Sequence, residues 1–316
     1  TAVRAGAELV EIRLPPRSYR REIRRVAAEL GSGNGAIAHT HGLRADLVGL
    51  RAARLAGAAA VSTIHGFTGG DWKTRLYEWL DLRTLRSFDA VAAVSRPIAD
   101  RLRKAGVTDG RVHVIPNSHP GSGPLLDRTA ARRRLEIPPD RLVAGWVGRL
   151  SSEKGPDLFL DALAQAPDWH GSILGSGPLR EPLLNQARRL GLGGRATWHG
   201  TVPGAGTLLR AFDTLVLSSR TEGTPVVLLE AMAAGVPTIV TRVGGVPDMV
   251  TEREAILVPP GDSAALARAL GEMRADPAAA AARARAAEGR QAAAFALDPW
   301  LDRYEALYRS VRRDLG

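Results

Sequence analysis

Two patterns of hydrophobic positions alternate along this chain of 316 residues. Short apolar runs, for example at 60–65 and 142–148, predict buried strands. Between such runs, apolar residues recur every three or four positions, as at 43–57 and 179–190, and predict amphipathic helices. Strands that alternate with helices are typical of parallel, doubly wound sheets, so the predicted fold class is α/β.

The pattern divides the chain into two such alternations, with a Gly- and Ser-rich stretch at 120–124 as the predicted linker. The first alternation predicts strands at 8–14, 36–41, 60–65, 90–95 and 112–117, and helices at 18–30, 43–57, 71–87 and 97–106. The second predicts strands at 142–148, 172–174, 196–199, 214–217, 238–241 and 255–258, and helices at 157–165, 179–190, 225–234, from about 264, 275–294 and 298–313. We therefore expect domains at 1–124 and 125–296, followed by a C-terminal segment at 297–316.

The stretch 218–250 carries the densest set of candidate functional residues. A buried strand is followed by a polar loop with Glu222, and Thr224-Pro225 then reads as an N-cap and first helical residue. Glu230 lies within this helix, which a glycine and a proline terminate at 235–237. A helix N-terminus at the carboxyl end of a strand suits an anion, since free N–H groups point at the ligand.

This stretch reads E-G-T-P-V-V-L-L-E-A-M-A-A-G-V-P and continues with G-G-V-P-D. It resembles the donor-sugar signature of retaining GT-B glycosyltransferases of family 4, the glycosyl transferases group 1. The segment G-R-L-S-S-E-K-G at 148–155 resembles the diphosphate-binding segment of the same family, and A-H-T-H-G, V-S-T-I-H-G-F, D-A-V-A-A-V-S and V-H-V-I-P-N resemble its N-terminal strand ends. The resemblance implies two Rossmann-like domains that face a cleft, with the helix at 298–313 packed back on the first domain.

The resemblance also implies roles for individual residues. Arg149 and Lys154, in the segment that Gly148 opens, would hold the diphosphate of a nucleotide-sugar donor and stabilise the charge that grows on the leaving oxygen. Glu230 would accept hydrogen bonds from both ribose hydroxyls, and Glu222 would bind hydroxyls of the donor sugar. Five further residues would complete the donor site: the backbone of Gly223 and Thr224 at the sugar, and Gly177, Pro178 and Val202 around the base.

The histidines fall at strand ends. His65 follows a predicted strand, where ligands of such sheets gather, and the resemblance gives it a contact with the donor sugar or phosphate. The alternative is a histidine that only completes a turn. His39 and His41 remain open between the two interpretations, and His113, inside a strand pattern, is expected to be structural.

Composition excludes several classes of protein. The 45% of hydrophobic residues suffices for two cores, and the absence of cysteine excludes disulfides and thiolate metal sites. No Asp-x-Asp occurs, so we expect no metal and no other cofactor in the donor site. The net charge is +10, of which the first 124 residues carry +8, but 40 of the 43 basic residues are arginine, which is also typical of a GC-rich genome. We therefore do not expect nucleic-acid binding.

One predicted helix concentrates this charge, because Arg17, Arg20, Arg21, Arg24 and Arg25 surround its apolar stripe. Two interpretations stay open: an ordinary solvated helix, or a surface that binds anionic lipid. The expected location is the cytoplasm, with attachment to the inner membrane face in the second case.

Three departures from the family pattern bear on activity. Asn117-Ser118-His119-Pro120 replaces the usual Asn-Gly-Val-Asp, and Asp248 replaces a glutamate. The sequence also begins near the second strand of the family, without the first strand, glycine loop and helix, so a fragment, a partner that supplies this piece, or impaired activity are all consistent with it.

The leading hypothesis is a retaining glycosyltransferase that moves a sugar from a nucleotide sugar to a glycan, a lipid-linked or a small-molecule acceptor. The alternatives are an epimerase or hydrolase of the same fold, or a non-catalytic sugar-nucleotide-binding protein. A glycosidase would need two carboxyls that face each other across a bond, whereas the resemblance gives one glutamate to the ribose. The glycines at 31–35 follow a helix and precede a strand, the wrong order for a dinucleotide site.

Overall fold

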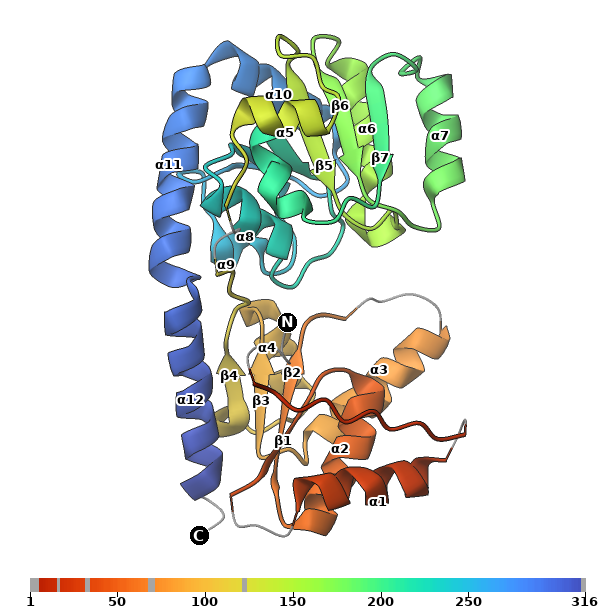
Figure 1. Cartoon of the computed structure of the whole chain (residues 1–316), viewed down its shortest axis with the longest axis vertical. Helices are drawn as coiled ribbons and strands as arrows, with labels where there is room; N and C mark the ends of the chain where they lie inside the picture. The colour runs from red at the N-terminus through yellow and green to blue at the C-terminus, as the bar shows by residue number, and fades with distance from the viewer. Residues whose placement is uncertain (1–5, 16–17, 32–34, 68–71, 121–123, 314–316) are drawn as a thin grey trace. The chain divides into compact units, whose positions relative to one another are not determined.

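The computed structural model describes residues 6–15, 18–31, 35–67, 72–120 and 124–313. They form two compact units (Figure 1). Unit 1 takes its residues from 1–93, 99–114 and 304–316, and unit 2 from 94–98 and 115–303. Each unit is a parallel sheet with helices around it, as the alternation of strands and helices predicts.

Unit 1 has a four-stranded parallel sheet in the order β1-β2-β3-β4. Its strands are β1 (Ile37–Thr40), β2 (Ala59–Ile64), β3 (Ala90–Ala93) and β4 (Val112–Val114). Its helices are α1 (Tyr19–Leu30), α2 (Leu43–Ala56), α3 (Trp72–Leu85) and most of α4 (Arg96–Lys104). Every residue of β2 and β3 is buried, because both strands lie inside the sheet and have cover on both faces.

Unit 2 has a six-stranded parallel sheet in the order β10-β9-β8-β5-β6-β7. Its strands are β5 (Val143–Val147), β6 (His170–Leu174), β7 (Ala196–Gly200), β8 (Thr214–Leu217), β9 (Thr238–Thr241) and β10 (Ile256–Val258). Its helices are α5 (Arg128–Arg134), α6 (Pro156–Gln165), α7 (Arg180–Arg189), α8 (Val226–Ala233), α9 (Val246–Met249), α10 (Ser263–Ala275) and α11 (Pro277–Ala294). One apolar core lies on each face of the sheet: α8 contributes to one, and α6, α7 and α10 to the other.

The last helix, α12 (Leu297–Arg313), begins in unit 2 and is part of unit 1 from Tyr304 onward. Tyr304, Leu307 and Val311 are buried. Their spacing of three and four residues puts them on one face of the helix, as the sequence pattern predicts. The Tyr304 hydroxyl lies 2.9 Å from Thr63 Oγ1, which ties this helix to the end of β2.

Three sequence-based expectations are wrong or incomplete. Residues 8–14 form no strand: no described strand pairs with them, and Leu9 remains 80% exposed. An apolar run becomes a strand only if a neighbour takes up its backbone hydrogen bonds. Helix α5 was not predicted, although Asp127 caps it by accepting a hydrogen bond from the Ala130 N–H at 2.8 Å. Third, Thr224 is not the N-cap of α8, since Pro225 occupies that position.

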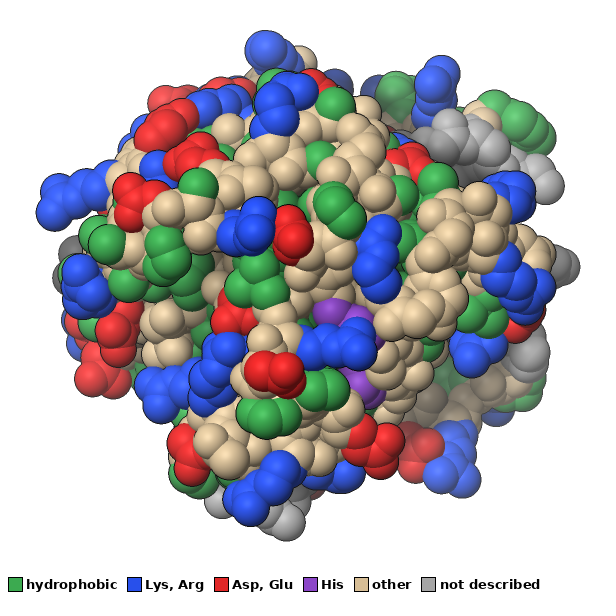
Figure 2. Space-filling model, turned by 90° about the horizontal axis from the view of Figure 1, so that it is seen from above, with side chains coloured by type: hydrophobic (Ala, Val, Ile, Leu, Met, Phe, Trp, Pro, Cys, Tyr) green, Lys and Arg blue, Asp and Glu red, His purple; other side chains and the backbone are tan. Residues whose placement is uncertain are grey.

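Within the described residues, no helix combines the length and apolar character needed to cross a bilayer. On the face drawn in Figure 2, basic and acidic side chains are interspersed, so the arginine excess does not gather into one continuous field there.

Candidate functional site

The order of strands in unit 2 creates a crevice beside β5. From β5 the chain proceeds outward through β6 and β7, and it then returns to β8, on the other side of β5, before proceeding to β9 and β10. The loops after β5 and β8 therefore leave in opposite directions, and in open parallel sheets ligands bind at this switch point. These are the two loops that carry Lys154 and Glu222.

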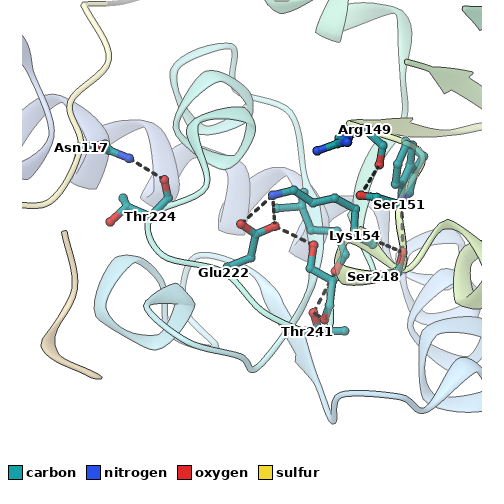
Figure 3. A network of polar contacts seen from close by, with 11 residues as sticks. Asn117, Arg149, Ser151, Lys154, Ser218, Glu222, Thr224 and Thr241 are labelled. Atoms are coloured by element: carbon teal, nitrogen blue, oxygen red, sulfur yellow. Dashed lines mark hydrogen bonds and ion pairs between the residues drawn. The ribbon is translucent and has the colours of Figure 1, made fainter. Parts of the chain in front are cut away.

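Lys154 and Glu222 meet at this point (Figure 3). Lys154 Nζ lies 2.8 Å from one carboxylate oxygen of Glu222 and 2.9 Å from the other. The hydroxyl of Ser219 donates to the same carboxylate at 2.7 Å. The Glu222 side chain is only 6% exposed, whereas that of Lys154 is 33% exposed. The cation therefore neutralises a buried carboxylate and still has one side open to a ligand.

Main-chain contacts fix the two loops. A Cβ on Gly244 would lie 1.8 Å from the Glu222 carbonyl oxygen, and a Cβ on Gly155 would lie 2.1 Å from that of Ser218. Both glycines also have positive φ, which favours glycine. Backbone thus packs directly against backbone on both sides of the Lys154–Glu222 pair, and only glycine permits this approach.

Thr224 does not cap α8. Its hydroxyl donates to the carbonyl of Val94 instead, and Pro225 occupies the cap position without a side-chain cap bond. Asn117 Nδ2 donates to the Thr224 carbonyl at 2.9 Å, so this residue of the variant Asn-Ser-His-Pro segment supports the Glu222 loop. Asp248 accepts a hydrogen bond from the Arg96 N–H at 2.8 Å, at the first residue of α4. Tertiary contacts at 94–98 thus override the local capping signal.

The loop before α8 carries two backbone N–H donors. Neither the N–H of Thr224 nor that of Gly223 has a hydrogen-bond partner among the described residues. Both N–H groups lie just before the first turn of α8, where the helix dipole favours negative charge or a lone pair. The loop therefore offers two N–H donors, and their contact with a donor sugar stays a prediction.

Glu230, on α8, is half-buried, and burial raises the pKa of its carboxyl. No described residue forms a hydrogen bond or ion pair with this side chain. A Cβ on Gly206 would lie 2.9 Å from Glu230 Oε1, so the glycine leaves room for the carboxylate. A half-buried carboxylate without a hydrogen-bond partner suits a side chain that accepts hydrogen bonds from the hydroxyls of a ligand.

The remaining predicted donor residues lie at the carboxyl ends of β5, β6 and β7. Arg149 is exposed, and no described residue pairs with its guanidinium. Gly177 is held by the backbone of Leu150, from which its Cβ would be only 2.5–2.8 Å away. Pro178 is exposed, Val202 is half-buried against the core, and Gly148 faces the Trp146 ring.

Four polar side chains of this site were not predicted. Trp146 Nε1 donates to Ser218 Oγ at 3.1 Å, and Ser218 Oγ donates to the Gly155 carbonyl at 2.6 Å. Arg220 forms two hydrogen bonds with Asp157, at 2.8 and 2.6 Å, so that the loop after β8 is linked to α6. The sequence around Arg220 carries no signal for its partner, because Asp157 lies 63 positions away.

His65 lies in unit 1, after β2, and is exposed. Its Nε2 lies 3.0 Å from His41 Nδ1, and the two rings stack at 5.2 Å between centroids. Next to them, His39 lies 2.6 Å from the Tyr308 hydroxyl and 2.8 Å from Thr63 Oγ1. Burial, with the nearby His41, lowers the pKa of His39 to about 4. His39 is thus a neutral structural histidine, whereas His41 and His65 line a cavity of about 350 Å³.

A carboxyl pair lies beside this cavity. Asp46 on α2 accepts hydrogen bonds from the Thr40 and Ser62 hydroxyls, the latter at 2.7 Å. Asp81 on α3 lines the cavity and is 8% exposed. Burial, and then the charge of Asp46, raise the pKa of Asp81 to about 7. The sequence analysis missed both residues, because helical carboxylates usually face solvent.

Among the described residues, no group of three or more histidine, aspartate or glutamate side chains has the arrangement of a metal site.

Comparison with known families bears on both units. The model of the glycosyl transferases group 1 matches residues 127–291, and the model of glycosyltransferase family 4 matches residues 3–118. Together these matches cover most of the chain, and each covers the sheet of one unit.

Individual proteins agree with the family models. The chain is 33% identical over 263 residues to the D-inositol 3-phosphate glycosyltransferase of Streptomyces avermitilis, a match that covers 73% of this chain and 56% of that protein. It is 31% identical over 260 residues to the 2-deoxystreptamine N-acetyl-D-glucosaminyltransferase of Streptomyces fradiae, with 75% and 62% covered. The chain thus spans little more than half the length of these relatives.

Solved structures show the same fold. Anabaena HepE in complex with UDP has a TM-score of 0.81 at 22% identity, with 92% of this chain and 81% of that chain covered. Sucrose-phosphate synthase from Thermosynechococcus elongatus has a TM-score of 0.82 at 24% identity, with 96% and 81% covered. Two parallel-sheet units and these neighbours establish the GT-B fold.

Proposed function

This chain belongs to the glycosyl transferases group 1 family and has the GT-B fold, and from that premise we propose that it transfers a hexosyl group from a nucleotide sugar to an acceptor with retention of configuration. One observation carries the proposal: Lys154 and Glu222, distant in sequence, meet at the switch point of the unit 2 sheet. Arg149 and the unpartnered carboxylate of Glu230 lie on elements that border the same strands.

The chemistry assigned to these groups follows from their charges. Lys154 and Arg149 would bind the diphosphate and stabilise the negative charge that develops as the bond between sugar and phosphate breaks. Because Lys154 is held by Glu222, it is positioned before the donor arrives, which avoids a cost of reorganisation. Glu230 would accept from the ribose hydroxyls, and Glu222 with the N–H groups of Gly223 and Thr224 would contact the donor sugar.

For the acceptor step, we propose that the donor phosphate takes the proton of the acceptor hydroxyl on the same face of the sugar, so that neither a metal nor another cofactor is required. His65 would assist at the donor sugar or phosphate. The names of the relatives indicate acceptors of several kinds, among them an inositol phosphate, 2-deoxystreptamine and an undecaprenyl diphosphate-linked sugar. A small-molecule, glycan or lipid-linked acceptor is the corresponding proposal for this chain.

The test is a panel of UDP-, GDP- and ADP-sugars, incubated with the protein in the presence and absence of cyclitol, glycan and lipid-linked acceptors. We expect nucleotide release that requires an acceptor and persists in EDTA, and a product anomer that matches the donor. Release without any acceptor would favour a hydrolase, and recovery of an isomerised donor would favour an epimerase. Binding without turnover across the panel would leave a sugar-nucleotide-binding protein as the better description, and a strict metal requirement would refute the metal-free mechanism.

We also propose that the enzyme works at an anionic membrane surface. On α1, Arg20, Arg21, Arg24 and Arg25 are all exposed, and no residue of the helix is fully buried. Arg17, the fifth predicted member, lies outside the described residues. The exposed arginines support reversible binding, since each basic residue near such a surface contributes about 1 kcal/mol. The sharper question is which part of unit 1 touches the lipid.

A further inference from the structure

Helix α3 has a large apolar surface on its solvent side. Its core face is set by Leu85, which is buried, together with Asp81. On the opposite face, Leu76 is 47% exposed, Trp79 54% and Leu80 36%. Their spacing of three and four residues places these three side chains together on one stripe. The side of the helix that meets solvent is thus apolar, which is unusual for a helix on the surface of a protein.

No other described element exposes as many large apolar side chains. Two more residues of α3, Trp72 at 69% and Tyr77 at 57%, add to the set, so that a helix of 14 residues exposes five. Elsewhere such residues are single or paired, as with Leu297 and Leu301 on α12, apart from Leu9, Val10 and Leu14 in the irregular segment before α1. Scattered exposed leucines need no explanation, but a cluster of this kind marks a contact surface.

The charged side chains of α3 are sorted by sign. Both acids point away from solvent: Glu78 is 13% exposed and pairs with Arg101 at 2.6 Å, and Asp81 is buried. The described charged residues on the outer side, Arg75 and Arg83, are both basic and exposed. The Arg83 guanidinium lies 5.8 Å from the centre of the Trp79 ring, so that aromatic and cationic groups share one patch.

We propose that the outer face of α3 is an interfacial lipid contact, with Leu76, Trp79 and Leu80 in the boundary between headgroups and acyl chains and the arginines on lipid phosphates. Tryptophan, tyrosine and arginine are the residues that favour this boundary, because each combines an apolar body with a polar end. The proposal refines the membrane contact proposed above, and it does not depend on sugar transfer.

Charge favours lipid over a second copy of the chain. In a symmetric dimer the same patch would face itself, which would bring Arg75 and Arg83 close to their own copies, whereas an anionic bilayer supplies a counter-charge at every position. Helix α1 also packs on α2, which packs on α3, so that the arginines of α1 belong to the same three-helix layer (Figure 1). Electrostatic attraction by α1 and apolar insertion by α3 would together give the two signals that stable attachment needs.

Co-sedimentation with vesicles, in the absence of any donor, tests the proposal. The parent should bind phosphatidylglycerol-containing vesicles, bind less as salt is raised, and bind pure phosphatidylcholine weakly. The triple variant Leu76→Ser, Trp79→Ser, Leu80→Ser should lose roughly tenfold or more of the affinity. Leu55→Ser on α2 and Leu301→Ser on α12, which are 66% and 48% exposed, are the matched controls and should bind as the parent does.

A second measurement remains informative if the triple variant fails to fold. Lipids brominated in the acyl chain should quench part of the tryptophan fluorescence of the parent. Trp79→Phe should retain binding, since phenylalanine is also apolar, but lose that quenched fraction. Replacement of Arg20, Arg21, Arg24 and Arg25 by glutamine should weaken binding to anionic vesicles at low salt and make the remaining binding less sensitive to salt. The quenching at saturating lipid should stay unchanged.

Three results would overturn the proposal. The first is that the parent does not bind anionic vesicles even at low salt. The second is that a folded triple variant binds as well as the parent, or that Trp79→Phe retains the full quenching. The third is a dimer in sedimentation velocity that the triple variant abolishes, which would mean that a second copy covers this face. Because no donor is present, none of these outcomes bears on whether the protein transfers sugar.

Discussion

The two sheets of this protein position their strand-end loops by different means. In unit 2, the loops after β5, β6, β8 and β9 are fixed by main chain against main chain, at glycines such as Gly155, Gly175 and Gly244. In unit 1, the last residues of β1 and β2 are held by side chains: His39 contacts Tyr308 and Thr63, and Asp46 accepts hydrogen bonds from Thr40 and Ser62. A methyl group added at one of these glycines would collide with backbone. The strand ends of unit 1, in contrast, should keep their shape after the loss of one hydrogen bond.

The difference matches what each loop carries. Unit 2 positions a buried carboxylate and its cation, whose mutual geometry must be held closely for charge stabilisation. Unit 1 holds two groups of shifted pKa: Asp81, which lines the cavity, and His39, which lies next to the cavity histidines. Burial is the main cause of both shifts.

The largest effect is expected for Gly244→Ala. The new methyl group would collide with the Glu222 carbonyl at a positive φ, and strain and overpacking together should reduce the free energy of unfolding by about 2–5 kcal/mol. Gly261→Ala is the matched control, because φ is also positive there but no atom lies within 4 Å, and it should lose only about 1–2 kcal/mol. Equal losses in urea titrations of the two variants would show that backbone contact does not fix the Glu222 loop.

The second prediction concerns the cations of the donor site. Lys154→Ala or Arg149→Ala should each reduce turnover by about 10²–10³-fold, the usual effect of losing a charge partner of the transition state. Lys104→Ala, at an exposed lysine of α4, should leave turnover unchanged. Since Lys154→Ala also leaves Glu222 buried without its cation, thermal melts must accompany the kinetics. Turnover within a few-fold of the parent in both variants would remove these cations from the mechanism.

The third prediction is that unit 1 carries two opposing pH dependences of stability. Burial lowers the pKa of His39 to about 4, so between about pH 4 and the ordinary value of 6.5 only the unfolded chain binds that proton, and stability rises with pH. Burial raises the pKa of Asp81 from 3.8 to about 7, so in that window only the folded protein holds the proton, and stability falls as pH rises. Each slope is at most about 1.4 kcal/mol per pH unit.

Variants separate these two slopes. Asp81→Asn should leave the His39 contribution, so that stability rises more steeply with pH than in the parent, and His39→Gln should give the opposite change. Urea unfolding at several pH values between about 4 and 7 measures both. If both variants follow the parent curve, the two side chains do not titrate as their burial requires.

The smallest effect is expected for Tyr308→Phe, which removes the hydrogen bond of 2.6 Å to His39 and should lower the free energy of unfolding by about 1 kcal/mol. Tyr77→Phe, at a tyrosine that is 57% exposed, should have almost no effect. A loss of several kcal/mol for Tyr308→Phe would mean that the loops of unit 1 are as intolerant of change as those of unit 2.

Much of this protein is determined by local sequence. Short apolar runs predict the described strands and a helical period predicts most helices, because these elements must bury apolar side chains against their neighbours. The motif around Glu222 and Glu230 predicts a strand, a loop and a helix, and β8 and α8 occupy those positions. The positions of Lys154, Glu222 and Glu230 on neighbouring elements follow from that order, although their roles at the donor remain predictions.

Other features were decided only by tertiary structure. Residues 8–14 read as a strand and lack a partner, and Thr224 reads as a cap but donates to Val94, 130 positions away. The pairing of Lys154 with Glu222 and the carboxyls of Asp46 and Asp81 beside the cavity likewise join distant segments. On α3, only the packing decides that Asp81 and Leu85 are buried while Leu76 and Trp79 stay exposed. Local sequence fixes which residues share a strand or a helix, but each of these outcomes depends on a neighbour that the fold brings close.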